Sequence, residues 1–169
     1  IRTESQGEER TVGTIQHTVI QQLQADASYA VIFDDDGAGE AADIVAIKIV
    51  DTEAVECIEV EFYHLKYAGG DPGARVGDLY EVCGQAQKSA SWMRNGAKRT
   101  ELFVHLLKRN ASRTDAGRSS RFERGGIDDL IAIRDRSRQT EVKLRMYIVQ
   151  PGLSKGAVSA SQLTLLAVT

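Results

Sequence analysis

Three strand-like runs follow one another in the first half of the chain, and no other feature of the sequence restricts the fold as strongly. They cover residues 29–33, 44–50 and about 57–67, and each is rich in β-branched or aromatic residues. The first run is followed by turn-forming residues at 34–37, which are typical of a loop between strands. Three strands in such close succession predict a β-sheet at the centre of the domain.

Helical patterns stand before and after these runs. An amphipathic helix is predicted over residues 11–25, where apolar residues recur at helical spacing: Val12, Ile15, Val19, Ile20 and Leu23. A second helix is predicted to begin with Asp78 as its N-cap, because Glu81 follows three residues later. Its apolar face comprises Leu79, Val82, Cys83, Ala86, Ala90 and Met93.

The second half of the chain is predicted to add one strand and three helices. Short helices are expected over residues 100–109 and about 128–137, whereas residues 110–126 lack periodicity and predict a loop or mobile arm. An alternating strand is expected around Val142 to Ile148, and Ser159 is a good N-cap for a last helix. The order of helix, three strands, helix and later strand predicts an α/β fold class with an αβββαβ core, in which helices flank a mixed central sheet.

Length and composition favour one cytoplasmic domain over residues 1–169. With 42% hydrophobic residues, the chain can bury a core without disulfides. Cys57 and Cys83 are predicted to be reduced core residues, as is typical of cytosolic proteins. No run approaches the roughly 18 apolar residues that cross a bilayer, so no membrane partner is expected. Because the chain begins with Ile and stops after a helical pattern, we expect it to be a piece of a longer protein.

Charge is strongly segregated along the chain. Residues 1–87 carry 5 basic and 17 acidic side chains, for a net charge of -12, whereas residues 88–124 carry 10 basic and 3 acidic ones, for a net charge of +7. An acidic part that holds metal and a basic part that holds phosphate are what a nuclease needs, although each part is also an ordinary solvated surface in many proteins.

Two places in the predicted sheet carry residues suited to phosphodiester hydrolysis. Asp43 stands at the start of the second run, and His64-Leu65-Lys66 lies near the end of the third. Here the sequence resembles the PD-(D/E)xK nuclease superfamily, in which an Asp on one strand and a (D/E)xK tripeptide on its neighbour carry the active site. The resemblance covers about residues 11–92 and implies a restriction-endonuclease-like fold and a Mg²⁺ or Mn²⁺ cofactor.

The resemblance implies a role for each site residue. Asp43 would hold the metal, and Lys66 would stabilise charge on the attacking water or the transition state. The sequence departs from the family at His64, which takes the acidic position; strand alternation puts it on the same face as Lys66, where it would ligate the metal or act as a base. Glu40, in the loop before Asp43, is the nearby carboxylate expected to replace the family's missing acid as a metal ligand. Glu81 is an alternative carboxylate.

Features outside the strands extend the resemblance. Gln85 and Ser89 lie one turn apart on the second helix, where many nucleases of this superfamily carry a Gln near the site, so Gln85 would position the site. Residues 147–155 and 161–163 are similar to the ends of nuclease domains fused to helicases in bacterial defence proteins. A helicase or another nucleic-acid-processing domain is therefore an expected partner, and a homo-oligomer is an open alternative.

Basic residues of the second predicted helix, of the end of the third and of the expected arm are candidates for nucleic-acid contact: Lys88, Arg109, Arg113, Arg118, Arg121 and Arg124. Since no aromatic platform accompanies them, phosphate contact without base readout is the expected mode. We therefore expect a metal-dependent nuclease that acts on DNA in preference to RNA. Two alternatives stay open at this point, namely a catalytically inactive nuclease-like module for binding or docking, and an unrelated α/β domain.

Overall fold

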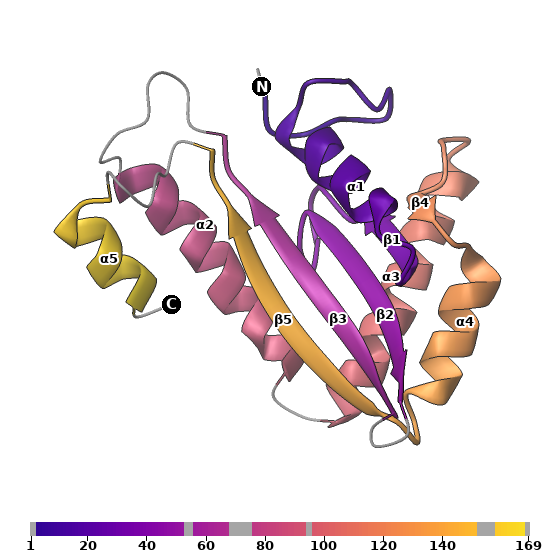
Figure 1. Ribbon diagram of the computed structural model, residues 1–169. Coiled ribbons are helices and arrows are strands. Elements are labelled where there is room, and N and C mark those ends of the chain that lie inside the picture. The colour runs from indigo at the N-terminus through magenta and orange to yellow at the C-terminus, as the bar shows by residue number, and fades with distance from the viewer. Residues whose placement is uncertain (1–2, 53–55, 68–75, 94–95, 152–157, 168–169) are drawn as a thin grey trace.

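A five-stranded mixed sheet forms the centre of the protein. The computed structural model describes residues 3–52, 56–67, 76–93, 96–151 and 158–167 (Figure 1). Its elements, in chain order, are α1 (Ile15–Ala25), β1 (Tyr29–Asp34), β2 (Ile44–Asp51), β3 (Glu56–Leu65), α2 (Val76–Ser89), the 3₁₀-helix η1 (Ala90–Met93), α3 (Gly96–Asp115), β4 (Phe122–Arg124), α4 (Ile127–Arg136), β5 (Glu141–Val149) and α5 (Ala160–Ala167).

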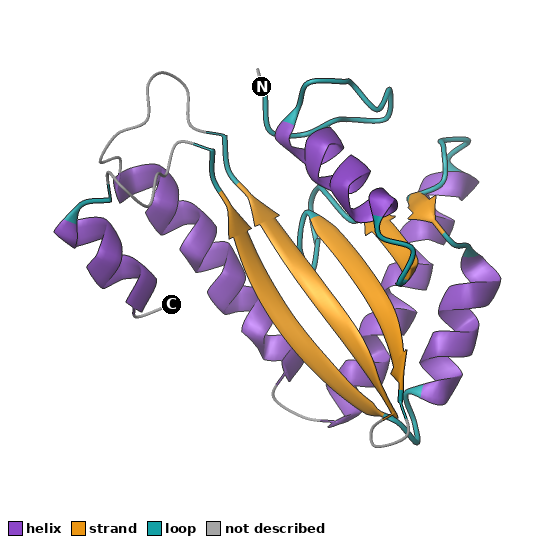
Figure 2. Ribbon diagram, in the orientation of Figure 1, coloured by secondary structure: helices purple, strands orange, loops and turns teal. Residues whose placement is uncertain are grey.

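The strand order in the sheet is β4-β1-β2-β3-β5 (Figure 2). Strands β1, β2 and β3 pair antiparallel, and short β4 pairs antiparallel with β1. Strand β5 runs parallel to β3 over the whole length from Cys57↔Glu141 to Leu65↔Val149. A parallel neighbour requires a crossover connection, which α2, α3, β4 and α4 supply. The prediction of an α/β fold with an αβββαβ order and a mixed sheet flanked by helices is confirmed.

Alternation along the strands divides the core into two layers. Helix α1 packs on one face, against Ile32, Ile44 and Ala46. Helices α3 and α4 cover the other face, which includes Phe33 and Phe62. Helix α2 lies on this second face too, because its apolar residues pack against Ile148 of β5, the register partner of His64. The two faces therefore place His64 toward α2 and its neighbour Leu65 toward α1.

The three predicted strands of the first half are confirmed, with small changes at their ends. Strand β3 stops at Leu65, so Lys66 lies just beyond it. Helix α1 begins at Ile15 rather than at residue 11, because Thr14 is the N-cap and Gly13 adopts a positive φ of 85°. Val12 is consequently outside the helix and 78% exposed, so its assignment to the apolar stripe was wrong.

The second predicted helix is confirmed, but its N-cap was wrong. Asp78 lies inside the first turn of α2, which starts at Val76. The predicted face is otherwise buried at Leu79, Val82 and Cys83. Its last two positions, at residues 90 and 93, belong to η1.

The predicted basic arm at residues 110–126 is corrected. Helix α3 continues through Asp115, well past the predicted end at residue 109, and β4 forms within the same segment. The side chain of Asn110 is buried, and its Oδ1 accepts hydrogen bonds from Ser120 Oγ and the Arg121 N–H, each at 3.0 Å. This tertiary contact folds the segment back onto α3, so it is ordered structure rather than a free arm.

The C-terminal predictions are largely confirmed. Helix α4 and strand β5 occur where the patterns placed them. Ser159 caps α5 through a reciprocal pair, in which its Oγ accepts from the Gln162 N–H and the Gln162 side chain accepts from the Ser159 N–H. Both cysteines are buried and free, as predicted. Among the described residues, no helix is long and apolar enough to cross a membrane.

Candidate functional site

A compact loop between β1 and β2 builds one side of the site. The buried Asp35 carboxylate accepts the Ala41 N–H at 2.7 Å and forms an ion pair with Arg109 of α3. Arg109 also donates to the carbonyl oxygens of Asp35 at 2.6 Å and Ala38 at 2.7 Å. Gly37 and Gly39 turn the chain with φ values of 110° and 83°, a region that favours glycine. The loop is thus held in one conformation by contacts within it and from α3.

Three carboxylates converge where this loop enters β2. Ligand oxygens of Asp36, Glu40 and Asp43 all lie within 4.8 Å of one another. Oxygens bound to one Mg²⁺ at about 2.1 Å lie at most about 4.2 Å apart, so only a small rotation of the side chains separates this arrangement from a ligand set. All three are hard oxygen donors, the ligand type that Mg²⁺ and Mn²⁺ prefer. The cluster therefore has the donor chemistry for a divalent cation, and its spacing would fit one after such a rotation.

Asp43 is the buried member of the cluster. The residue is only 5% exposed, and its Oδ2 accepts a hydrogen bond from the Leu65 N–H of β3 at 2.8 Å. Burial raises the pKa of Asp43 to about 7, the Leu65 hydrogen bond opposes that rise, and the nearby charge of Glu40 adds to it. A desolvated carboxylate among other carboxylates is stabilised by a cation, so this residue gains most from a bound metal.

His64 lies beside the cluster rather than inside it. Its Nδ1 is 4.0 Å from Asp43 Oδ2, which is too long for a hydrogen bond. The residue is 1% exposed, and neither ring nitrogen has a hydrogen-bond partner among the described residues. Burial lowers the pKa of His64 to about 4, so the ring is neutral near pH 7. A neutral imidazole has a free lone pair for a metal, a water or a substrate proton.

Lys66 comes close to Asp43 through its backbone, while its amine points to other acids. The Leu65 N–H that binds Asp43 immediately precedes it in the chain. Its Nζ donates to Glu81 of α2 at 2.8 Å and lies 3.8 Å from Glu4. The Glu81 hydrogen bond raises the pKa of Lys66. The alternative carboxylate Glu81 is therefore a partner of Lys66 and not a member of the carboxylate cluster.

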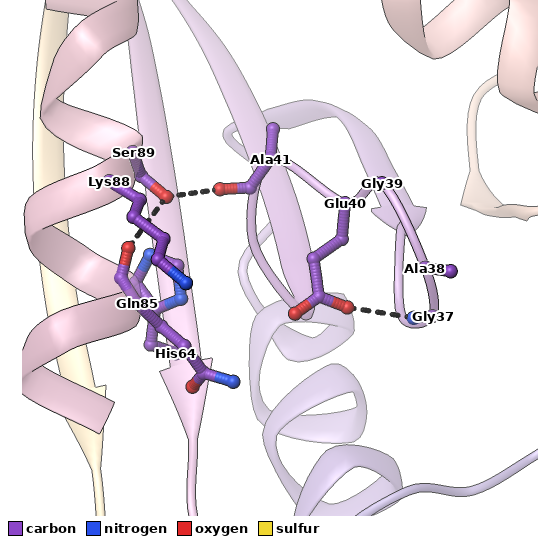
Figure 3. Close-up of a pocket in the computed structure, with 9 residues that line it drawn as sticks. All are labelled: Gly37, Ala38, Gly39, Glu40, Ala41, His64, Gln85, Lys88 and Ser89. Atoms are coloured by element: carbon purple, nitrogen blue, oxygen red, sulfur yellow. Dashed lines mark hydrogen bonds between the residues drawn. The ribbon is translucent and has the colours of Figure 1, made fainter. Parts of the chain in front are cut away.

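A pocket of about 290 Å³ opens between the loop and α2. Figure 3 shows Glu40 on the loop side and Gln85, Lys88 and Ser89 of α2 on the other, with His64 of β3 on the same side of the view as α2. The pocket is lined by Gly37, Ala38, Gly39, Glu40, Ala41, His64, Gln85, Lys88 and Ser89. Ser89 Oγ donates to the Ala41 carbonyl and ties α2 to the loop. Gln85 Oε1 is buried and has no partner among the described residues, and Lys88 is exposed at the rim.

The predicted nucleic-acid-binding arginines mostly have partners within the protein. Arg121 donates to the Asp34 carbonyl at 2.9 Å, and Arg118 pairs with Glu8. Arg124, the last residue of β4, donates to the carbonyl oxygens of Gln24 and Asp26 at the end of α1. Arg109 and Arg121 thus hold the β1–β2 loop, which gives two of these residues a structural function that the sequence did not indicate.

Two acidic residues of the site were not among the sequence candidates. Asp36 was predicted to be part of a turn. The signal that could have identified it as a site residue is that Asp36 and Glu40 lie four residues apart in one loop. Glu4 gave none, because only tertiary structure brings it to Lys66; its Oε2 accepts the Tyr67 N–H at 2.8 Å. The predicted pairing of Glu40 with Asp43 is present in the cluster. His64 lies beside Asp43 and Gln85 lines the adjacent pocket, whereas the Lys66 amine pairs with Glu81 and Glu4.

The fold and the site together define an α/β protein with a carboxylate cluster at the loop before β2 and a histidine and lysine at the end of β3. Searches of protein-family models, curated proteins and solved structures find no match to this chain. Functional inference consequently depends on the geometry of the chain itself.

Proposed function

We propose that this protein is a metal-dependent nuclease, a phosphodiester hydrolase of the PD-(D/E)xK type that acts on DNA. One observation carries the proposal. Asp43 at the start of β2 is hydrogen bonded to the His64-Leu65-Lys66 tripeptide at the end of β3, and it belongs to a three-carboxylate cluster beside a pocket. Acids in the loop before β2 thus lie next to the end of β3 that carries His64 and precedes Lys66, and this supports the arrangement that the resemblance implies.

Asp36, Glu40 and Asp43 would hold Mg²⁺ or Mn²⁺. When bound there, the metal would polarise a phosphate oxygen and lower the pKa of a water molecule. Asp36 would supply the carboxylate that is missing because His64 occupies the acidic position of the family's tripeptide. His64 remains close enough to join the ligand set after a side-chain rotation.

The other polar side chains around the pocket would bind and orient the water molecule and the phosphate. The His64 Nδ1 can accept a hydrogen bond from a water molecule at the cluster, since the ring is neutral. The Lys66 amine, held by Glu81 and Glu4, supplies a positive charge at the same end of the sheet. Gln85 offers an amide whose oxygen has no hydrogen-bond partner among the described residues, and Lys88 offers a positive charge at the rim for a phosphate.

Incubation of the protein with plasmid, linear duplex and single-stranded DNA and RNA tests the proposal, in Mg²⁺, Mn²⁺ or EDTA. Asp43→Asn and Lys66→Met are expected to lose metal-dependent cleavage. Asp51→Asn is the matched control, because Asp51 lies at the opposite end of β2 with its side chain 71% exposed. Equal cleavage by wild type and Asp43→Asn would assign the activity to a contaminant and reject this site.

The second candidate is a binding module that has lost catalysis. It is favoured by His64 in the acidic position and by the engagement of the Lys66 amine with Glu81 and Glu4. Retention of DNA without cleavage, unaffected by Asp43→Asn, would select it. We also propose, from the free buried thiols and the resemblance, a cytoplasmic protein that works with a helicase or another nucleic-acid-processing domain.

A further inference from the structure

A second pocket lies on the other side of the β1–β2 loop from the carboxylate cluster. Its volume is about 190 Å³, and it is lined by Ala38, Arg109, Ser112, Arg113, Arg118 and Arg121. Ala38 lines both this arginine pocket and the pocket beside the cluster, so one loop residue separates the two. Four arginine side chains therefore line one small cavity.

Arg113 has hydrogen-bonding capacity that the protein does not use. The residue is only 8% exposed, yet its Nε is buried with no hydrogen-bond partner among the described residues. Its other contacts are long, at 3.9 Å to Asp34 and 3.4 Å to Ser119 Oγ. A buried guanidinium with an unused N–H is costly unless an acceptor reaches it. The arginine pocket is the space from which such an acceptor would come.

Charge in the arginine pocket is only partly balanced. Ion pairs join Asp35 to Arg109, Asp34 to Arg113 and Glu8 to Arg118, whereas Arg121 donates to backbone carbonyls. Burial lowers the pKa of Arg121, and the neighbouring charges of Arg109 and Arg113 lower it further, against the opposing effect of Asp35. The Nε of Arg121 is also buried, and within the described ranges it has no hydrogen-bond partner. An anion with several acceptor oxygens would relieve this repulsion and satisfy both N–H groups.

Phosphate has the chemistry that the arginine pocket requires. Guanidinium groups bind its oxygens in bidentate pairs, and a serine hydroxyl such as that of Ser112 is a common additional donor. We propose that the arginine pocket binds one phosphate group and, resting on the proposed nuclease function, that this phosphate belongs to the bound strand at a position other than the one cleaved. The loop at Ala38 would then lie between two phosphates of one strand.

Inorganic phosphate titrated into the protein tests the pocket without reference to catalysis. The titration uses Asp43→Asn in EDTA, with binding followed by calorimetry and by amide shifts of residues 112–121. Ser112→Glu places a carboxylate in the pocket from an exposed helix position, and we expect phosphate to bind it at least about tenfold more weakly than its matched control Ser112→Gln. Arg118→Gln should weaken binding similarly, whereas Arg145→Gln on β5 should not.

A short DNA strand titrated into the same variants identifies the source of the phosphate. Weaker strand binding by Ser112→Glu, with a smaller salt dependence and unchanged affinity in Ser112→Gln, supports a strand phosphate. Loss of inorganic phosphate binding with unchanged strand binding would overturn the strand assignment and leave a site for free phosphate. Equal phosphate binding by all variants would overturn the pocket itself. Cleavage by the wild type with metal is measured separately, so failure of the nuclease proposal is seen independently.

Discussion

The Asp43 carboxylate accepts the backbone N–H of Leu65 at 2.8 Å, across the junction of β2 and β3. The hydrogen bond holds the Asp43 carboxylate next to Leu65, which stands between His64 and Lys66 in the chain. The pairing of β2 with β3 therefore brings Asp43 and the His64-Leu65-Lys66 tripeptide together. Because strands hold positions better than loops do, Asp43 is the best-ordered anchor of the carboxylate cluster.

Asp43→Asn is expected to stabilise the metal-free protein at pH 8. Burial raises the pKa of Asp43 from its ordinary 3.8 to about 7 in the folded state. A carboxyl group whose pKa is higher in the folded than in the unfolded state stabilises the fold at pH values below its unfolded pKa of 3.8. This contribution is lost as the pH rises through the folded pKa of about 7, so ionised Asp43 lowers the stability at pH 8. The asparagine, which keeps the bond to Leu65, should gain about 2 to 4 kcal/mol there and much less at pH 5.

Urea unfolding in EDTA at the two pH values measures this effect. Asp51→Asn serves as the control, since its side chain is 71% exposed and should change stability little at either pH. A loss of stability in Asp43→Asn at pH 8 would contradict the inferred burial of an unpaired negative charge.

Mn²⁺ is expected to raise the melting temperature of the wild type at pH 8. A ligand that binds only the folded state stabilises it in proportion to the logarithm of its concentration, and here it also neutralises the charge on Asp43. The shift should disappear in Asp43→Asn and shrink in Asp36→Asn and Glu40→Gln, with Mn²⁺ affinity lower by about tenfold or more. Undiminished shifts in both of the latter variants would place the metal elsewhere on the chain.

Lys66→Met is expected to remove cleavage with little effect on folding. The amine is paired with Glu81, whose side chain is 58% exposed, and such pairs contribute at most about 1 kcal/mol. Loss of a charge that acts on the transition state typically costs about 100-fold or more in rate. Glu81→Gln separates the two functions, because it breaks the ion pair and leaves the lysine in place. If Glu81→Gln were as inactive as Lys66→Met, cleavage would require the ion pair and not the lysine amine alone.

Local patterns account for the parts of the fold that the sequence predicted. Strand alternation placed His64 and Leu65 on opposite faces, and Ser159 marked a helix start as an N-cap, because both depend on neighbours in the chain. The candidate site needed more. Asp43 was found by its position before a strand, whereas Glu4 reaches Lys66 only through packing of the N-terminal segment, which no periodicity encodes.

The arginine-rich segment shows the same limit and provides the last test. Its composition indicates a mobile arm, but one buried amide, Asn110, accepts two hydrogen bonds from it. Asn110→Ala should leave the Arg121 N–H and the Ser120 hydroxyl without that acceptor and cost about 1 to 3 kcal/mol.

Amide hydrogen exchange measures the local consequence of this change. Exchange at Arg121 should accelerate in Asn110→Ala, while Ser119→Ala, which removes only the long 3.4 Å contact to Arg113, should leave it nearly unchanged. Because Arg121 also holds the β1–β2 loop through the Asp34 carbonyl, the same variant should loosen the loop that carries Asp36 and Glu40. Weaker Mn²⁺ binding in Asn110→Ala would therefore follow from a residue that contacts neither the metal ligands nor the substrate pocket. Unaltered exchange at Arg121 would instead mean that β4 alone orders this segment.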